Sequence, residues 1–503
     1  MSALVESKNS LKSFSRTSFS RKAVSRTIGA IAFNSLLMLI VLTAIPYGAA
    51  EPWWKAFFEC LVFVLAGLCV IQKLVWTEAP GQNLRLFVPI FVLLAFAFIQ
   101  TISWSGSAGN AIDKVSRTIS ADAFQTRLFI IHISALVVVV WLLRLQTNSQ
   151  KRLRRLVELV IATGFLSACF GLLRQASQRE AGFFLPNLEQ GFGYAQFINP
   201  NHFAFLMEMT LGLTLGIVVS LGVTGRRLAL YIIAAVPMWI ALVLSNSRGG
   251  LLSILCQLLF LGLIFLSPRS EHARGKTETP DRSFLRTSRL FAIRGILIVA
   301  LLSAAIVTVV FVGGDPLAAK LEAVPVELSR TTADSYVLRQ NIWRATWDLI
   351  KDHPIAGVGF GGYWIEITKY HNASGEVTPQ EAHNDYLELL ASGGVIGLAI
   401  ATWFTFVFVG AVRRQLRVAD HYRRAVTLGA LAGILTVSVH SLVDFGLHIT
   451  INALVFVVLI SLATIDTPSP NIKEFRAGGR TDKSLTQRLR VSILGGSFSK
   501  PRT

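Results

Sequence analysis

Two arginines in this sequence stand in settings that suit the binding of phosphate oxygens. Arg248 lies in Ser245-Asn-Ser-Arg-Gly-Gly250, where two glycines let a ligand approach the backbone closely. Arg339 precedes Trp343 by four residues, so the two share one face of an expected helix; Arg344 is the alternative if that face is wrongly assigned. A guanidinium offers a rigid fork of donors for phosphate. The competing interpretations are a snorkelling arginine at the membrane surface for Arg248 and a solvated helix charge for Arg339.

A histidine in a polar motif is the candidate general base. His383 opens the segment His383-Asn-Asp-Tyr-Leu-Glu388, just before an apolar stretch. An imidazole titrates near neutral pH and is the commonest general base. Asp385 and Glu388 could orient this ring or cap the helix that follows, and Asn384 is a candidate binding residue. The competing interpretation of His383 is a structural histidine.

Two further groups of polar residues are candidates for substrate binding. Asn201 and His202 follow Pro200, and we expect Asn201 to cap a helix that begins at His202. His440, Asp444 and His448 have the spacing i, i+4, i+8, which predicts one helical face. Ionisable groups at membrane depth are costly and usually functional, but a turn at this point would leave them in water, and the sequence leaves both possibilities open.

The sequence indicates no metal or cofactor. No Cys/His spacing or acidic cluster resembles a metal site, and there is no P-loop. The four cysteines lie in apolar runs, where they behave as small buried hydrophobes rather than as a disulfide framework: Cys60, Cys69, Cys169 and Cys256.

The elements that must position these residues are membrane helices. The chain is 52% hydrophobic and 15% charged, against about 25% charged in a soluble domain. A span needs about 20 mostly apolar residues, and twelve stretches qualify. They lie near 27–46, 55–76, 84–103, 126–144, 155–173, 202–222, 229–246, 249–267, 291–312, 393–412, 425–443 and 448–465.

The basic residues predict the orientation of the chain. With both termini in the cytoplasm, the tails and inner loops hold 35 of the 48 lysines and arginines, as the positive-inside rule requires. The formal net charge of +19 then reflects topology and attraction to membrane lipid headgroups, and we expect no nucleic-acid partner.

The expected organisation has one large outer loop. A basic cytoplasmic tail (1–26) precedes transmembrane helices one to nine (27–312), and a basic cytoplasmic tail (467–503) follows helices ten to twelve (393–466). The loop at 313–392 is too long to be a mere connection, and it contains a helix-like run and a glycine-rich turn. The motifs above all fall on its side of the membrane.

Taken in order, these motifs resemble those of the bacterial O-antigen ligase and polysaccharide polymerase superfamily. The resemblance covers roughly residues 150–465, and the first four spans match only as apolar helices. Pro200 stands where a basic residue is more usual. The matching segments begin at Phe197, Ser245, Arg339, His353, His383, Gly393 and His440.

The resemblance implies an all-α polytopic membrane protein of GT-C-like glycosyltransferase architecture, with about twelve transmembrane helices and one large periplasmic loop, in the bacterial inner membrane. The implied donor is a glycan on undecaprenyl diphosphate. The implied acceptor is a sugar hydroxyl on lipid A core for a ligase, or on a growing glycan for a polymerase. By position, Arg248 and Arg339 correspond to the arginines that bind the diphosphate in this superfamily. His383 corresponds to its catalytic histidine, the expected general base. The expected substrate-binding residues are Arg344, Asn201, His202, Asn384, Asp385, Asp444 and His440.

Direct attack by the acceptor hydroxyl would invert the anomeric centre.

Two other functions remain open from sequence: a non-enzymatic flippase or exporter of lipid-linked glycans, and a protein O-oligosaccharyltransferase. Charged residues gather in the outer loops rather than within several spans, which favours an enzyme acting at one face over a transporter.

Overall fold

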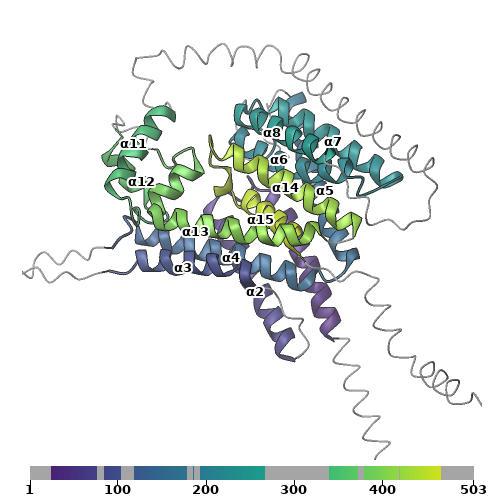
Figure 1. The fold of residues 1–503 in the computed structure, drawn as a ribbon, viewed down its shortest axis with the longest axis horizontal. Coiled ribbons are helices and arrows are strands. Elements are labelled where there is room, and N and C mark those ends of the chain that lie inside the picture. The colour runs from purple at the N-terminus through teal and green to yellow at the C-terminus, as the bar shows by residue number, and fades with distance from the viewer. Residues whose placement is uncertain are drawn as a thin grey trace, which may run out of the picture.

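The computed structural model describes residues 24–75, 84–103, 118–177, 185, 188, 193–266, 339–371, 379–417 and 420–465. These residues form α-helices and short 3-10 turns, without a β-strand beyond one isolated bridge between Tyr194 and Phe197. The chain therefore builds an all-α protein (Figure 1). The terminal tails, the span expected at 291–312 and the loop before Arg339 lie outside the described residues.

Seven described helices are long and apolar enough to cross a membrane, so the chain is a polytopic membrane protein. They are Val24–Ala44, α2 (Pro52–Val75), α4 (Ala123–Gln146), α5 (Gln150–Ala176), α6 (Pro200–Val219), α7 (Arg226–Leu244) and α13 (Asp385–Leu416). Shorter or less apolar helices accompany them: α3 (Val88–Gln100), α8 (Arg248–Leu266), α14 (His421–His440) and α15 (Thr450–Thr464). Each expected span other than 291–312 corresponds to one of these helices, whereas the total of twelve stays a prediction.

Contacts between helix ends show which ends of the helices lie together. At one end, which we call the site end, Asn201 at the start of α6 donates to Asp444 just after α14, and the Asp385 amide at the start of α13 donates to the Ser441 carbonyl. At the other end, which we call the basic end, Arg144 late in α4 donates to Thr464 at the end of α15. α13 begins at the site end and finishes at the basic end.

The centre of the helix bundle is α6, which other helices surround on all sides. Its membrane-length window is fully buried within the protein. Glycines let α14 approach it closely: a Cβ added at Gly216 would lie 2.3 Å from the Gly429 Cα atom, and one at Gly212 would lie 2.7 Å from Gly433 Cα. Small residues at a helix crossing allow this backbone-to-backbone packing in membranes. The bundle therefore holds the starts of α6 and α15 and the end of α14 in a fixed arrangement.

The glycine-rich turn at 357–362 fastens the outer helices to the bundle. It follows α11 (Arg339–Asp352) and leads into α12 (Tyr363–Glu366), which both lie beside the start of α13 (Figure 1). Gly357 has φ +65°, and an added Cβ would lie 2.4 Å from the Ser392 carbonyl carbon. The Gln100 side chain donates to Ala356 and Ser392, at 2.8 and 3.1 Å. These glycines therefore serve close packing between segments.

The start of α13 lies earlier than expected. The span at 393–412 was expected to begin at residue 393, whereas the helix begins at Asp385 and changes direction at Gly394, whose φ of 60° and ψ of −162° are not helical. The Asn384 side chain accepts hydrogen bonds from the amides of Tyr386 and Leu387, both at 3.0 Å, and so caps the helix. This polar first part of α13 brings the end of the outer segment onto the bundle.

Candidate functional site

Asp444 lies at the centre of the polar residues at the site end. Of the two possibilities left open for His440, Asp444 and His448, the structure shows the turn and not the single helical face, because α14 ends at His440. The turn does not leave them all in water, since His440 and Asp444 are buried. Asp444 is in that turn and His448 closes a 3-10 helix, Gly446–His448. Gly446 is needed here, since an added Cβ would lie 2.3 Å from the Phe205 ring. The three side chains consequently point to three different sets of partners.

The Asp444 carboxylate is buried and joins three other segments of the chain. Its Oδ2 atom accepts a hydrogen bond from Asn201 and, at 3.2 Å, one from Arg339 Nη2. Its Oδ1 atom accepts the Phe445 amide at 2.9 Å and lies 3.7 Å from His383 Nδ1. The structure thus brings Asn201, Arg339 and His383 around one carboxylate.

These partners keep Asp444 ionised. Burial alone would raise its pKa, but the imidazole of His383, the charge of Arg339 and the Phe445 amide together outweigh burial and lower the pKa to about 2. An ionised carboxylate can hold the Nδ1 atom of His383 as its protonated nitrogen, which leaves Nε2 free to accept a proton.

His383 occupies a constrained backbone position between two anchored residues. Its φ of 51° is unusual for a residue with a side chain, and such strain costs on the order of 1–3 kcal/mol. The preceding carbonyl, that of Ala382, accepts a hydrogen bond from Trp343 Nε1 at 3.0 Å. The Asp385 amide that follows donates to Ser441 at 2.9 Å. The surrounding structure therefore maintains the strain and aims a ring that is 31% exposed toward Asp444.

α11 brings one of its two arginines to the site. Arg339 reaches Asp444, and Trp343, on the same face, reaches Ala382. Arg344 is exposed, and its position five residues after Arg339 places it about 140° around the helix. The face expected from the spacing of Arg339 and Trp343 is thus the face that meets the bundle, and Arg344 is directed away from Asp444.

Two residues at the start of α6 also reach this region. Asn199, not Asn201, caps α6, because its side chain accepts the Asn201 amide at 2.9 Å and the helix begins at Pro200. The expected cap role of Asn201 was wrong, and its side chain is available for Asp444. His202 is buried and makes an edge contact with Phe445 at 4.9 Å between ring centroids, the same ring that His383 contacts at 4.7 Å.

The carboxylates that follow His383 serve a different histidine. Glu388 Oε1 and Asp385 Oδ1 lie 3.4 and 3.7 Å from His448 Nε2, and Glu381 Oε1 lies 3.5 Å from its Nδ1. Asp385 and Glu388 are therefore paired with His448, while Asp444 is the carboxylate beside His383. This grouping could not be predicted from the sequence, because residues 381 and 448 are far apart along the chain.

Glu381, Glu388 and His448 place one possible metal-ligand atom each within 4.8 Å of one another. The sequence predicts no acidic cluster of this kind, so this possible metal-binding group was not expected. Burial would lower the pKa of His448, but Glu388, Glu381 and Asp385 raise it to about 10. Without a metal, the protonated imidazole can interact with these carboxylates, the nearest of which is Glu388 at 3.4 Å.

Arg248 borders a buried acid–histidine pair. It is the first residue of α8, and the Ser247 hydroxyl caps the helix by accepting the Gly250 amide at 3.1 Å. A Cβ added at Gly249 would lie 2.4 Å from His440 Nε2. His440 Nδ1 in turn lies 2.7 Å from Glu208 Oε1, and both side chains are buried. Glu208 was not among the predicted site residues, although an acidic residue within an apolar span is itself a signal of function.

One comparison with known proteins gives a match. Residues 233–402, about a third of the chain, match a family described as O-antigen ligase. The matched stretch includes Arg248, Arg339 and His383, whereas Asn201 and Asp444 lie outside it. A search of curated proteins found no match.

Proposed function

This chain belongs to the O-antigen ligase-related superfamily, and from the geometry around Asp444 we propose that it is a glycosyltransferase of the bacterial inner membrane. It moves a glycan from undecaprenyl diphosphate onto a sugar hydroxyl at the periplasmic face. The acceptor is lipid A core if the enzyme is a ligase, or a second lipid-linked glycan if it is a polymerase. These substrates are the ones that the resemblance to the O-antigen ligase and polysaccharide polymerase superfamily implies.

One observation carries the proposal: a buried carboxylate lies next to both His383, the proposed general base, and Arg339, the proposed phosphate-binding residue. Asp444 lies 3.7 Å from His383 Nδ1 and 3.2 Å from Arg339 Nη2. The Arg339 side chain is 43% exposed and that of Asp444 only 1%. A substrate entering from outside therefore meets the imidazole and the guanidinium, while the carboxylate positions both.

The reaction follows from these roles. The oxygen of the acceptor hydroxyl attacks the anomeric carbon of the donor glycan, and its proton passes to His383 Nε2. The bond between that carbon and the diphosphate oxygen breaks, and the electron pair leaves with the diphosphate. The diphosphate itself supplies the activation, so the transfer needs no nucleotide. Proton removal by a positioned base contributes about 10²–10⁴-fold in rate.

Two arginines are assigned to the leaving group. Negative charge grows on the diphosphate as the bond to the sugar breaks, and guanidinium forks stabilise such oxygens by charge-assisted hydrogen bonds. Arg339 is next to the base. Arg248 starts α8 beside His440, where the positive end of the helix dipole adds to its charge. Asn201, His202 and Asn384 complete the proposed substrate-binding region.

The proposed orientation rests on the two helix ends. Arg85, Arg144 and Arg414 lie together at the basic end, and cytoplasmic ends are rich in such residues. The site end then faces the periplasm, with 313–392 as the large periplasmic loop and both tails in the cytoplasm. The proposal includes a twelve-span, GT-C-like architecture.

The test compares His383→Ala with Arg344→Ala in cells that lack the chromosomal copy. We expect His383→Ala to lose surface polysaccharide at normal protein level, and Arg344→Ala to retain it because its side chain points away from Asp444. Lipid-linked intermediates resolved on a gel identify the reaction: full-length chains accumulate if a ligase is lost, and single repeat units if a polymerase is lost.

The same experiment separates the proposal from its rivals. A flippase would tolerate His383→Ala, since transport needs no general base. An oligosaccharyltransferase would leave the polysaccharide intact and lose glycan from protein. Wild-type polysaccharide made by His383→Ala would overturn the assignment of the base.

A further inference from the structure

A buried acid–histidine pair lies inside the helix bundle, and the proposed reaction does not use it. Glu208 is on α6 and His440 is the last residue of α14, and their side chains are 0% and 1% exposed. His440 Nδ1 lies 2.7 Å from Glu208 Oε1. Apolar side chains of similar size could fill the same space, and burying an acid in a membrane protein is costly. The pair therefore needs an explanation other than packing.

The ring of His440 is fixed by contacts with three other elements of the bundle. Glu208 holds its Nδ1 atom, and Phe205 stacks on its face with 4.1 Å between ring centroids and 25° between the ring planes. The Nε2 edge meets α8, since a Cβ added at Gly249 would lie 2.4 Å from Nε2. The histidine therefore presents a fixed edge to the backbone at the start of α8.

Glu208 makes the equivalent contact with the next residue of α8. A Cβ added at Gly250 would lie 3.2 Å from Glu208 Oε1. The two residues that follow Arg248 are thus each packed against one member of the pair. Glycine has the freest backbone of all residues, and neither glycine has a side chain that could fix this turn by its own contacts. The pair supplies the surface that defines where the first turn of α8 lies.

His440 also adjoins the part of the site around Asp444. Its carbonyl accepts the amides of Val443 and Asp444, at 2.9 and 3.1 Å. The backbone of His440 therefore carries the turn that leads to Asp444, whereas its side chain contacts the helix start that carries Arg248. The side-chain contacts favour a role toward Arg248.

We propose that Glu208 and His440 are positioning residues for Arg248: they fix the start of α8 so that the guanidinium meets the diphosphate of the donor. This inference rests on the proposed function, which assigns Arg248 to the leaving group. Both residues act through the backbone of Gly249 and Gly250 and do not touch the substrate. Loss of the pair should therefore impair use of the donor and leave binding of the acceptor unchanged.

The test measures transfer by the full-length protein in membrane vesicles, with donor and acceptor concentrations varied separately. The donor is the lipid-linked glycan extracted from cells that lack this protein. The acceptor is lipid A core or a second lipid-linked glycan, according to the intermediate that accumulates on the gel. The variants are Glu208→Ala, Glu208→Gln, Arg248→Lys and the double variant of Glu208→Ala with Arg248→Lys.

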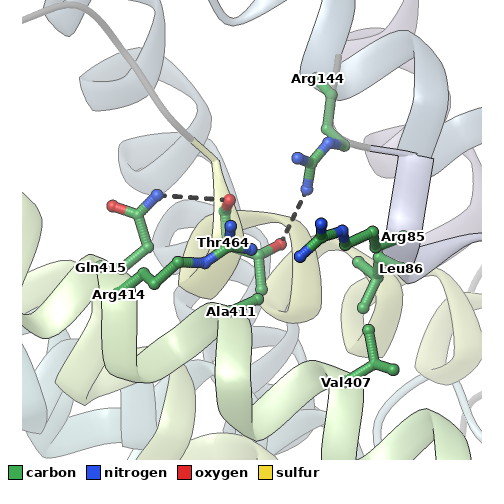
Figure 2. Close-up of a pocket in the computed structure, with 8 residues that line it drawn as sticks. All are labelled: Arg85, Leu86, Arg144, Val407, Ala411, Arg414, Gln415 and Thr464. Atoms are coloured by element: carbon green, nitrogen blue, oxygen red, sulfur yellow. Dashed lines mark hydrogen bonds between the residues drawn. The ribbon is translucent and has the colours of Figure 1, made fainter.

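Two control variants each lose a hydrogen bond between helices without changing the pair. Gln257, on α8, donates to the backbone carbonyl of Glu208 at 3.0 Å and to the Thr436 hydroxyl on α14 at 2.7 Å. Gln257→Leu thus loosens the same three helices but spares the carboxylate and the imidazole. Thr464→Val removes the hydrogen bond from Arg144 at the basic end, 3.2 Å long (Figure 2). We expect both controls to unfold at a lower temperature and to keep wild-type kinetics.

Glu208→Ala should lower kcat/KM for the donor about 10–100-fold, because a misplacement of about 1 Å in a positioned group can cost on the order of 10²-fold. The KM for the acceptor should not change. Glu208→Gln can keep a hydrogen bond to His440 and should restore most of the activity. Arg248→Lys should itself be impaired, since lysine lacks the guanidinium fork. Adding Glu208→Ala to Arg248→Lys should cost little more, because the group that the pair positions is already lost.

Three results would each overturn the positioning role: equal losses in Gln257→Leu and Glu208→Ala, a comparable rise in the KM for the acceptor, or full additivity with Arg248→Lys. If Glu208→Ala does not fold, Gly249→Ala decides the matter, because it keeps the pair and changes only its contact with α8; wild-type kinetics would then overturn the inference. Wild-type transfer by Arg248→Lys would instead refute the assignment of Arg248 in the proposed function, so the two failures are distinguishable.

Discussion

Replacing Asp444 by asparagine separates the charge of this residue from its shape. Asparagine is the same size, and its side-chain oxygen can still accept the Phe445 amide. Its NH2 group, however, would face the donors of Asn201 and Arg339, which now bind Oδ2. The variant therefore loses both the charge and one set of acceptors, and leaves the Arg339 guanidinium without its carboxylate.

The loss in stability follows from the pKa of Asp444. A decrease from 3.8 to about 2 corresponds to nearly two units, or about 2.5 kcal/mol at neutral pH, at 1.36 kcal/mol per unit. Because Arg339 is 43% exposed, solvent screens its share, and we expect about 1.5–2.5 kcal/mol. Asp444 has a lowered folded-state pKa, so this stability is present above about pH 4 and is lost as the pH falls toward 2.

The assay combines thermal unfolding in detergent with glycan transfer in membrane vesicles. Asp444→Asn should unfold at a lower temperature at pH 7, and the difference from wild type should shrink as the pH falls from 4. Transfer should decrease by about 10²–10⁴-fold, because His383 loses the group that orients its proton. Asp348→Asn is the control, since Asp348 is exposed and forms a surface ion pair with Lys351. Wild-type unfolding and wild-type transfer in Asp444→Asn would refute the central role of this carboxylate.

Three further predictions concern buried contacts, and thermal unfolding and vesicle transfer check each of them. Glu208→Ala should destabilise the protein by about 1–3 kcal/mol, because it leaves the buried His440 Nδ1 atom without its hydrogen-bond partner; Glu208→Gln, which can keep a hydrogen bond, should cost less, and equal costs would contradict the role of this hydrogen bond. Gly249→Ala should reduce transfer because the new methyl group must displace His440, whereas Gly262→Ala, which has open space around it, should be neutral. Gly357→Ala should destabilise by more than about 1 kcal/mol, since its φ is positive and Ser392 blocks the methyl group; Gly225→Ala has the same sign of φ but open space and should cost less.

Most of the helical framework could be predicted because it depends on local composition. Length and apolarity located each described helix of the bundle but not α12 (Tyr363–Glu366), and the basic residues predicted which helix ends face the cytoplasm. Boundaries were less accurate where a polar residue caps a helix: Asn384 caps α13, which begins eight residues before the expected span, and Asn199 caps α6. A hydropathy pattern does not detect such a cap, because the cap depends on a hydrogen bond from the helix to a polar side chain just outside it.

The candidate site could be predicted only as a set of residue types. Arg339 and His383 were chosen for their chemistry and motif, and the structure brings them to one carboxylate. The partner relations could not be predicted, because Asp444 is 105 residues from Arg339 and 243 from Asn201 along the chain. Likewise, the spacing of His440, Asp444 and His448 favoured one face, but packing of Gly446 against Phe205 needs a turn there. Tertiary contacts decide such cases.

The occupancy of the Asp444 oxygens predicts the stereochemistry of the proposed transfer. A reaction with retention needs a carboxylate nucleophile that attacks the anomeric carbon, followed by a second displacement. Asp444 cannot supply it, because Oδ1 accepts the Phe445 amide and faces His383, Oδ2 accepts Asn201 and Arg339, and the side chain is only 1% exposed. Asp385 and Glu388 are paired with His448. Among these described carboxylates none is available as a nucleophile, so we expect the acceptor hydroxyl to attack directly, and NMR of the product linkage should show an inverted anomeric centre relative to the donor. A retained centre, or a glycan trapped covalently on a carboxylate, would show that one of these side chains leaves its partners during the reaction.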